Sequence, residues 1–513
     1  MQTLDDVHTK TPEEMKVIVQ QLQKLIAERD QTIESLRYQL NNALRHRFGK
    51  KSEKDNPNQP SLFDEGTQPD NTEEIIEAES EITVAAYQRK KPGRKPISED
   101  LPRVQQIHDL PESEKTCSCG CTLNKIGEET TEQLDFIPAK AQVIQHVRYK
   151  YACKRCEETI KTAKGPKHPI PKSIASPGLL AHIAVSKFCD GLPLYRMESI
   201  LQRMGVDIAR NTLSHWMIKV SELLLPLYKL QQYNIINYDV TYADETPVQV
   251  LKEPDRPPES KSYMWVFIGG PPEKRSIIYH YDVSRGHGVP LHILEDFQGW
   301  LHCDGHSAYD TYAKVKHGVT LLGCWMHCRR KFLDVTKTIK TEGLAHEAVK
   351  KIAKLYRIEY EIKQNCTSAQ AVYEYRQQYA KPLLIEFKQW LDENVHHVRP
   401  KSPLGDAFGY ALNQWEKLTR YLEDGRLEMD NGESERKIKP FVIGRKAWLF
   451  CDSVAGAKAA EIIYTIIETA KYHKVEPYSY LRYVLTQLPN ISTEKELEAL
   501  LPFNIDQTVL TIK

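Results

Sequence analysis

The chain of 513 residues is longer than a single hydrophobic core usually organises, so we expect several domains. Hydrophobic residues make up 41% of it and charged residues 27%, which is typical of a soluble globular protein, and no apolar run approaches the roughly 20 residues that span a bilayer. The formal net charge of +1 excludes a uniformly basic chain, so any contact with nucleic acid must come from local patches.

The N-terminus and the cysteines indicate the compartment. The first residues lack the basic, apolar and small pattern of a secretory signal, so we expect a cytoplasmic protein without a membrane partner. An odd number of cysteines, eleven, fits free thiols and one metal site better than a disulfide framework.

Residues 1–54 carry a heptad pattern of apolar side chains. This pattern predicts a coiled coil that joins protomers into a homo-oligomer, although a single amphipathic helix lying on its own protein has the same pattern. The apolar positions are Met15, Val19, Leu22, Ile26, Ile33, Leu36, Leu40 and Ala43.

Residues 55–103 are expected to form a disordered acidic and basic linker. Nine acidic residues and no basic ones lie between Asp55 and Gln88, and five basic residues follow between Arg89 and Lys95. The basic end is suited to the minor groove of DNA, but a solvated extended linker has the same composition.

Residues 104–170 contain two groups of cysteines on either side of a strand-like segment, 141–151. Thiolates at Cys-x-x-Cys spacing bind Zn²⁺ tetrahedrally, so we expect a small zinc-binding β domain that uses four of the five thiols. The alternative is a β domain with free thiols. The five residues are Cys117, Cys119, Cys121, Cys153 and Cys156.

Residues 171–232 have a helical pattern interrupted at Gly205, which is the outline of a helix-turn-helix. In that arrangement, the start of the second helix reads DNA bases. Two packed helices without a role in DNA binding share the pattern. The candidate base-reading residues are Arg210, Asn211, Thr212 and Ser214.

From residue 233 the pattern changes to strands. Segments 237–243, 263–269 and 276–283 are followed, after a helical stretch, by strands at 300–303 and 319–322. This order resembles a ribonuclease-H-like sheet, in which the first and fourth strands are neighbours. Asp244 and Asp304 directly follow those two strands, so we expect both to end strands and their carboxylates to be close together.

Two neighbouring carboxylates fit a glycosidase acid and base pair, a metal site or plain strand caps. A third carboxylate favours metal, because phosphoryl transfer on DNA uses two cations that need several carboxylate oxygens. Downstream, residues 430–440 open a helix that contains both Glu433 and Glu435.

Several short motifs follow one another along the chain. Besides the cysteine-rich region, they lie at 48–54, 192–196, 243–247, 303–309, 324–332 and 444–450. In this order they resemble the bacterial transposases of the insertion-sequence-sixty-six family, and the resemblance covers nearly the whole length. One departure is the spacing Cys117-Ser-Cys119-Gly-Cys121, where the family usually has Cys-x-x-Cys-Gly.

The resemblance implies a DNA transposase with an Asp-Asp-Glu (DDE) triad of Asp244, Asp304 and Glu435, holding Mg²⁺ or Mn²⁺. Glu433 is the rival third acid. The family further implies DNA partners, namely terminal inverted repeats and target DNA, with accessory proteins of the same element as further partners, so the chain is expected to be nucleoid-associated when bound.

Two basic segments are candidate phosphate contacts. One follows the strand at 319–322 and contains His327, Arg329 and Arg330; alternatives are a core helix and a second metal site built from Cys324, His327 and Cys328. The other adjoins Glu435, where a solvated face is the alternative. Its candidates are Arg436, Lys437, Lys439, Arg445 and Lys446.

The predicted architecture is therefore a multidomain α+β protein. The coiled coil, the linker, the zinc domain and the helix-turn-helix-like region precede a ribonuclease-H-like α/β catalytic domain at 233–450, with a helical insertion at about 336–424, and a C-terminal helical region at 451–513. The rival functions are a zinc-containing helix-turn-helix regulator without catalysis and another nuclease of the same fold.

Overall fold

The description of the fold rests on a computed structural model, which describes residues 29, 141–152, 160–337 and 342–510. Of these, residues 148–152, 160–337 and 342–510 belong to one compact unit, to which the rest of this description refers. The predicted coiled coil and linker, and all five candidate zinc cysteines, lie outside the described residues.

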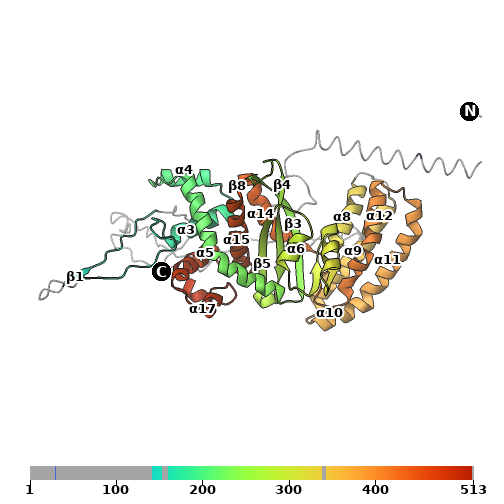
Figure 1. Cartoon of the computed structure of the whole chain (residues 1–513). Coiled ribbons are helices and arrows are strands. Elements are labelled where there is room, and N and C mark those ends of the chain that lie inside the picture. Colours follow the sequence, from blue (N-terminus) through green and yellow to red (C-terminus); the bar gives the residue numbers. More distant parts are fainter. Residues whose placement is uncertain (1–28, 30–140, 153–159, 338–341, 511–513) are drawn as a thin grey trace, which may run out of the picture. The chain divides into compact units, whose positions relative to one another are not determined.

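A mixed sheet lies at the centre of this unit (Figure 1). Its first three strands are antiparallel neighbours, and the next two run parallel to the first one. The strand order is β5-β4-β3-β6-β7. The bounds are β3 (Val240–Lys252), β4 (Lys261–Gly269), β5 (Ser276–Asp282), β6 (Gly299–His302) and β7 (Val319–Leu322).

The expected pairing of the first and fourth strands is confirmed. Strands β3 and β6 are parallel neighbours, and the last paired residues are Tyr242 and His302. Asp244 and Asp304 each follow two positions later, so both carboxylates lie where the paired segment opens.

The prediction that Asp244 ends its strand is wrong, because β3 continues for eight more residues, to Lys252. The continuation is stabilised by β4, which pairs with β3 as far as Gln249. On its other edge, β3 pairs with β6 up to Tyr242 and then with the short strand β8 (Cys451–Ser453) from Val250. Asp244 therefore lies in a gap between two partners on the same edge of the sheet.

Helix α15 (Val454–Tyr472) covers the β5 edge of the sheet. Buried backbone N–H groups of β5 donate hydrogen bonds to side chains one and two turns apart on α15: Ile277 to Thr469, Tyr279 to Thr465, and Tyr281 to Glu461, at 2.9–3.1 Å. An open sheet edge would leave these donors without partners. The helix α5 (Arg210–Ile236) packs beside α15 and also contacts β4 and β5.

The predicted pair of helices around Gly205 is present as α4 (Leu194–Arg203) and the start of α5. Gly205 has φ +78°, a conformation that glycine adopts without strain, so the chain turns there. Helix α3 (Pro177–Phe188) packs against α16 (Pro477–Gln487), α15 and α5, which joins the helical pair to the C-terminal helices.

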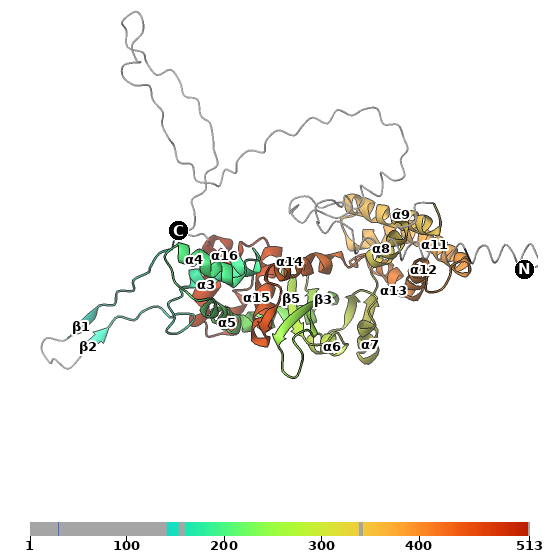
Figure 2. The ribbon, with the colours of Figure 1, turned by 90° about the horizontal axis from the view of Figure 1, so that it is seen from above.

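The residues between β7 and helix α14 (Gly432–Trp448) are mostly helical, as predicted for 336–424. These helices lie on one side of the sheet, while α3, α4 and α15 lie on the other (Figure 1, Figure 2). They are α8 (Trp325–Thr336), α9 (Leu344–Asn365), α10 (Ala369–Tyr375), the π-helical turn Arg376–Ala380, α11 (Lys381–Asn394), α12 (Pro403–Asn413) and α13 (Trp415–Thr419).

The remaining elements complete the unit. Within the described residues, none of the helices is both long enough and apolar enough to cross a membrane. The other elements are β1 (Lys150–Ala152), which pairs antiparallel with β2 (Ile160–Thr162), α6 (Gly288–Ile293), α7 (Ser307–Val315), α14 (Gly432–Trp448) and α17 (Glu494–Glu498).

Candidate active site

Helix α14 brings the third predicted carboxylate to the gap beside Asp244. Asn431, at the N-cap of this helix, is fully buried, and its Nδ2 donates a hydrogen bond of 2.8 Å to the carbonyl oxygen of Ala243. Glu435 lies one turn into α14, and its backbone N–H donates to the carbonyl of Asn431. The N-terminal turn of α14 is thus fastened to the strand residue that precedes Asp244.

The electrostatics of Asp244 indicate that the three acids are near one another. Burial, together with the charges of the Glu245, Glu435 and Asp304 carboxylates, raises the pKa of Asp244 to about 8, against a hydrogen bond from the backbone N–H of Glu245. Asp304 accepts a hydrogen bond of 2.8 Å from the N–H of His306, which holds one carboxylate oxygen in place. A buried carboxyl whose pKa is raised in this way is typical of functional sites.

Glu245 is a further acid at the site, and the sequence reasoning did not single it out. Its side chain is only 1% exposed and is bound on both oxygens: Oε1 by Arg285 at 2.6 Å and Oε2 by the Tyr309 hydroxyl at 2.7 Å. These contacts hold Glu245 in place and give it Arg285 as a counter-ion. The signal for it in the sequence is its position next to Asp244.

The two candidate acids of α14 have different surroundings. Glu433 forms an ion pair of 2.6 Å with Arg275, and both side chains are largely buried. Glu435 is 3.2 Å from the half-exposed guanidinium of Arg330 and 3.6 Å from Nδ1 of His327. The charge of Glu435 is among those that raise the pKa of Asp244, whereas Glu433 is paired with Arg275.

Helix α8 places a basic segment beside Glu435. His327 and Arg330 both face this carboxylate, whereas Arg329 lies over the ring of Tyr356. Burial lowers the pKa of His327, although the charge of Glu435 opposes this shift. Ligand atoms of Cys324, His327 and Glu435 lie within 4.8 Å of one another.

The alternative metal site predicted from Cys324, His327 and Cys328 is not formed by these three side chains. Cys328 is fully buried in the core, and the group that the structure brings together contains Glu435 in its place. Positions 324, 327 and 328 share a helical turn, but the side chain of residue 328 points into the packing of α8 against the core.

The residues at this site fit a divalent cation. Hard cations bind carboxylate oxygens, and the site offers three carboxylates from β3, the end of β6 and α14. Among the described residues, Oε1 of Glu435, Nδ1 of His327 and Oδ1 of Asn431 are buried without a hydrogen-bond partner. Buried polar atoms are rarely left unpaired, so a bound ion or water is the usual partner for such a group.

The basic residues of α14 divide into two sets. Arg436, Lys439 and Lys446 are exposed and reach solvent beyond Glu435. Lys437 is partly buried, 4.0 Å from Glu468 and 5.5 Å above the ring of Tyr472, and Arg445 donates to the Thr246 hydroxyl at 3.1 Å. The exposed three are therefore the better candidates for contacts with DNA phosphates.

The predicted base-reading residues lie at the start of α5, where Arg210, Asn211 and Thr212 are exposed and Ser214 is partly exposed. The backbone N–H of Arg210 donates to the carboxylate of Glu198, on α4, at 3.0 Å. The carboxylate of Glu198 thus accepts a hydrogen bond from an N–H group at the start of α5, where the helix itself offers no acceptor. The contact links α4 to α5. Glu198 is a positioning residue that the sequence reasoning did not identify.

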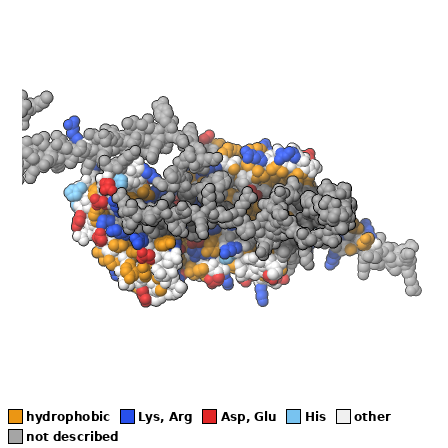
Figure 3. Space-filling model, turned by 180° about the vertical axis from the view of Figure 1, so that it is seen from behind, with side chains coloured by type: hydrophobic (Ala, Val, Ile, Leu, Met, Phe, Trp, Pro, Cys, Tyr) orange, Lys and Arg blue, Asp and Glu red, His pale blue; other side chains and the backbone are white. Residues whose placement is uncertain are grey.

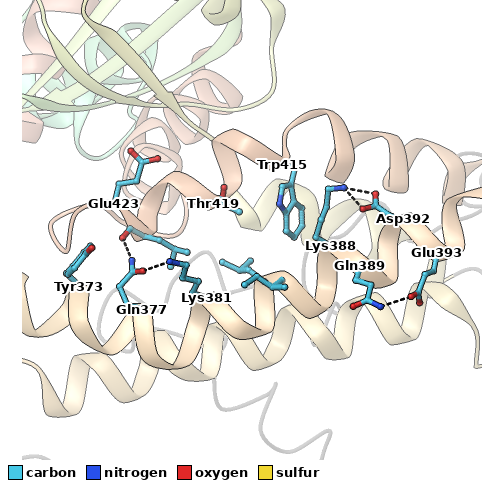
Figure 4. Close-up of a pocket in the computed structure, with 13 residues that line it drawn as sticks. Tyr373, Gln377, Lys381, Lys388, Gln389, Asp392, Glu393, Trp415, Thr419 and Glu423 are labelled. Carbon is cyan, nitrogen blue, oxygen red and sulfur yellow. Dashed lines mark hydrogen bonds and ion pairs between the residues drawn. The ribbon is translucent and has the colours of Figure 1, made fainter.

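A groove of about 980 Å³ lies among α10, α11 and α13, but none of the predicted site residues lines it (Figure 4). Hydrophobic, basic and acidic side chains are mixed on the visible part of the face in Figure 3, in keeping with the small net charge.

Family models match most of the chain. The model described as "Transposase IS66 family" matches residues 172–459, which include Asp244, Asp304 and Glu435. The "zinc-finger binding domain of transposase IS66" matches 114–157, the range of the five cysteines. Models described as "Transposase C of IS166 homeodomain" and "IS66 C-terminal element" match 35–105 and 465–503.

Two relatives from Sinorhizobium fredii (strain NBRC 101917 / NGR234) resemble the chain over most of its length. The uncharacterized protein y4qI is 32% identical over 448 residues, 84% of this chain and 81% of that protein. The uncharacterized protein y4jD is 33% identical over 420 residues, 80% of this chain and 81% of that protein. The order of the matching models and the extent of these relatives together show that the chain belongs to the IS66 family of transposases.

Proposed function

We propose that this protein is a DNA transposase that binds the terminal inverted repeats of its element and catalyses metal-dependent strand cleavage and strand transfer. The proposal is supported by the hydrogen bond of Asn431, one turn before Glu435, to Ala243, the residue before Asp244, and by the pairing of β3 with β6, which ends two residues before Asp244 and Asp304. The strand order β5-β4-β3-β6-β7, with three antiparallel strands and two parallel ones, supports a ribonuclease-H-like catalytic fold.

In this proposal, Asp244, Asp304 and Glu435 hold Mg²⁺ or Mn²⁺. The cations, when bound, supply the charge that activates the attacking oxygen and stabilises the leaving oxygen. Other residues of the protein hold these carboxylates and their neighbour in position. Asn431 attaches the helix of Glu435 to β3, and the N–H of His306 binds one oxygen of Asp304. Arg285 and Tyr309 hold Glu245.

DNA is held by parts that surround the carboxylates. We propose that Arg436, Lys439 and Lys446 contact phosphates, and that Arg210, Asn211, Thr212 and Ser214 contact the terminal repeat. Because phosphate contacts release counterions, binding should weaken steeply with salt. We also propose that four of the five cysteines bind Zn²⁺, that residues 1–54 join protomers, and that accessory proteins of the same element act with the complex.

The test is a cleavage and joining assay on DNA that carries a terminal repeat, with Mg²⁺ or Mn²⁺. Asp304→Asn should lose both activities and keep binding of the repeat. Asp452→Asn is the matched control, because Asp452 is an exposed aspartate paired with Lys252 at 2.8 Å. Cleavage that persists in Asp304→Asn would sink the assignment.

The rival functions give different results in the same assay. A regulator without catalysis binds the repeat and never cleaves it, with either cation. A junction-cleaving nuclease of the same fold cuts DNA but does not join the free 3′-hydroxyl to a second duplex. Joined products from the wild-type protein therefore distinguish a transposase from both rivals.

A further inference from the structure

We infer that His327 is a nitrogen ligand of the cation that Glu435 holds, so that the site combines three carboxylates with one imidazole. The inference rests on the proposed function, since it concerns the same cation. It assigns to His327 a different role from the phosphate contact predicted from the sequence.

The two oxygens of Glu435 have different surroundings. Oε2 faces outward, 3.2 Å from Arg330, whose side chain is 50% exposed. Oε1 is buried without a hydrogen-bond partner among the described residues. It faces Nδ1 of His327, which is also buried and has no hydrogen-bond partner in this part of the structure. One donor or acceptor left unpaired is costly, and two facing each other indicate a shared third partner.

The separation of these two atoms is informative. Oε1 of Glu435 and Nδ1 of His327 are 3.6 Å apart, which is too far for a hydrogen bond. Two ligand atoms at about 2.1 Å from one ion are about 3.0 Å apart at a right angle and about 3.4 Å apart at the tetrahedral angle. The observed distance is slightly longer than these two separations. The two side chains would therefore need to move only slightly closer together to bind one ion.

A second histidine and glutamate pair in the same molecule provides the contrast. Nδ1 of His280 and Oε1 of Glu461 are 3.1 Å apart, a direct hydrogen bond, and Oε2 of Glu461 accepts from the N–H of Tyr281. Both pairs are partly buried. His280 and Glu461 are hydrogen-bonded to each other. By contrast, Nδ1 of His327 and Oε1 of Glu435 are too far apart for a hydrogen bond, and neither has another partner among the described residues.

Cys324 is close enough to be considered and is not assigned as a ligand. Its thiol lies within 4.8 Å of the other two groups, but it is fully buried and its Sγ accepts a hydrogen bond of 3.2 Å from the backbone N–H of Asn431. This contact fastens the start of α14 to the start of α8. Cys324 therefore positions Glu435 against His327.

An imidazole ligand changes which cation the site prefers. Carboxylate and water ligands suit Mg²⁺, whereas imidazole nitrogen adds affinity for transition metals such as Mn²⁺. Loss of the nitrogen should thus weaken Mn²⁺ binding more than Mg²⁺ binding. This difference separates a ligand from a residue that only shapes the site, because a distorted site should lose both cations alike.

The experiment is pulsed electron paramagnetic resonance of Mn²⁺ bound to the full-length protein, with Mn²⁺ affinity measured on the same samples. The wild type should show modulation from a directly bound ¹⁴N nucleus, and His327→Ala and His327→Asn should lose it, with Mn²⁺ affinity lower by roughly tenfold or more. His280→Asn is the matched control and should keep the nitrogen signal.

The outcomes separate this inference from the proposed function. If wild-type protein binds Mn²⁺ without nitrogen modulation, His327 is not a ligand, whatever the variants do. Modulation that survives in folded His327→Ala overturns the inference too, provided that Asp304→Asn abolishes binding. If instead wild-type protein binds no Mn²⁺, or binds it equally well with Asp244, Asp304 and Glu435 each replaced, the proposed function fails. A circular-dichroism melt of each variant reports folding, and the wild-type spectrum remains decisive if a variant does not fold.

Discussion

The side-chain amide of Asn431 donates a hydrogen bond of 2.8 Å to the carbonyl oxygen of Ala243, and this contact joins residues 188 positions apart in the chain. It attaches the helix that carries Glu435 to the strand that carries Asp244. On the edge of β3 that faces away from β4, Ala243 lies between the last pairing with β6 and the first pairing with β8, so this edge of the strand is unpaired there. This one hydrogen bond thus gives a backbone carbonyl of β3 a partner and holds α14 beside the strand that carries Asp244.

Replacing Asn431 by Ala should lower both stability and activity. The buried carbonyl of Ala243 would lose its partner, which costs about 1–3 kcal/mol, and α14 would no longer be held at the gap. Thermal melting and the cleavage assay measure the two effects. Asn365→Ala is the control, since its amide bonds to an exposed helical carbonyl; equal losses in the two variants would contradict the positioning role.

Glu433→Gln and Glu435→Gln should have opposite effects. Glu433 forms a largely buried ion pair with Arg275, so its replacement leaves a buried guanidinium without its counter-charge and lowers the melting temperature, while cleavage continues. Glu435→Gln should keep the melting temperature and lose cleavage. The reverse pattern would make Glu433 the third acid.

Asp244→Asn should stabilise the protein in the presence of a chelator. Burial and the neighbouring carboxylates raise the pKa of Asp244 to about 8, so at neutral pH folding must protonate a side chain that is ionised in the unfolded chain. The neutral isostere avoids this cost. The melting temperature with EDTA should rise, and any further rise on adding Mg²⁺ should disappear. A lower melting temperature with EDTA would mean that Asp244 has a structural partner instead. Site residues that reduce stability in this way are common in enzymes.

Thr465→Val should destabilise the edge of the sheet. The hydroxyl of Thr465 accepts from the N–H of Tyr279 at 2.9 Å in a buried position, and valine keeps the shape while removing the acceptor. An unpaired buried N–H group costs about 1–3 kcal/mol. Thr465→Ser restores the hydroxyl and should recover most of the loss in a thermal melt. If serine is no better than valine, the hydrogen bond is not the cause.

Gly299→Ala should be strongly destabilising. Gly299 starts β6 with φ +134°, and a Cβ at this position would lie 2.2 Å from the carbonyl oxygen of Asp239, so the strand that leads to Asp304 could not dock on β3. Gly409→Ala is the control, because a Cβ there, within α12, meets nothing within 4 Å and should be neutral or stabilise by about 0.5–1 kcal/mol. The comparison needs only soluble expression and melting temperatures.

Strands and helices that depend on a local sequence pattern are predicted correctly. The apolar runs at 263–269 and 319–322 predicted strands whose ends agree with β4 and β7 to within two residues, because a buried strand requires continuous apolar side chains. The helices around Gly205 and the helical stretch after β7 were predicted for the same reason. By contrast, the extension of β3 beyond Asp244 was missed, since Asp-Glu-Thr-Pro has little strand propensity and is held in the sheet by β4.

By itself, the sequence determined the types of chemical group and the order of the elements: one aspartate in the first strand and one after the fourth, an acidic helix start, and motifs in the order of the family. Only the tertiary structure shows how the surroundings of Glu433 and Glu435 differ, because their local sequence pattern does not distinguish them. Arg275 binds one of them, and Asn431 brings the other to Ala243. Contacts between residues more than a hundred positions apart leave no periodic trace along the chain, and packing alone brings these side chains together.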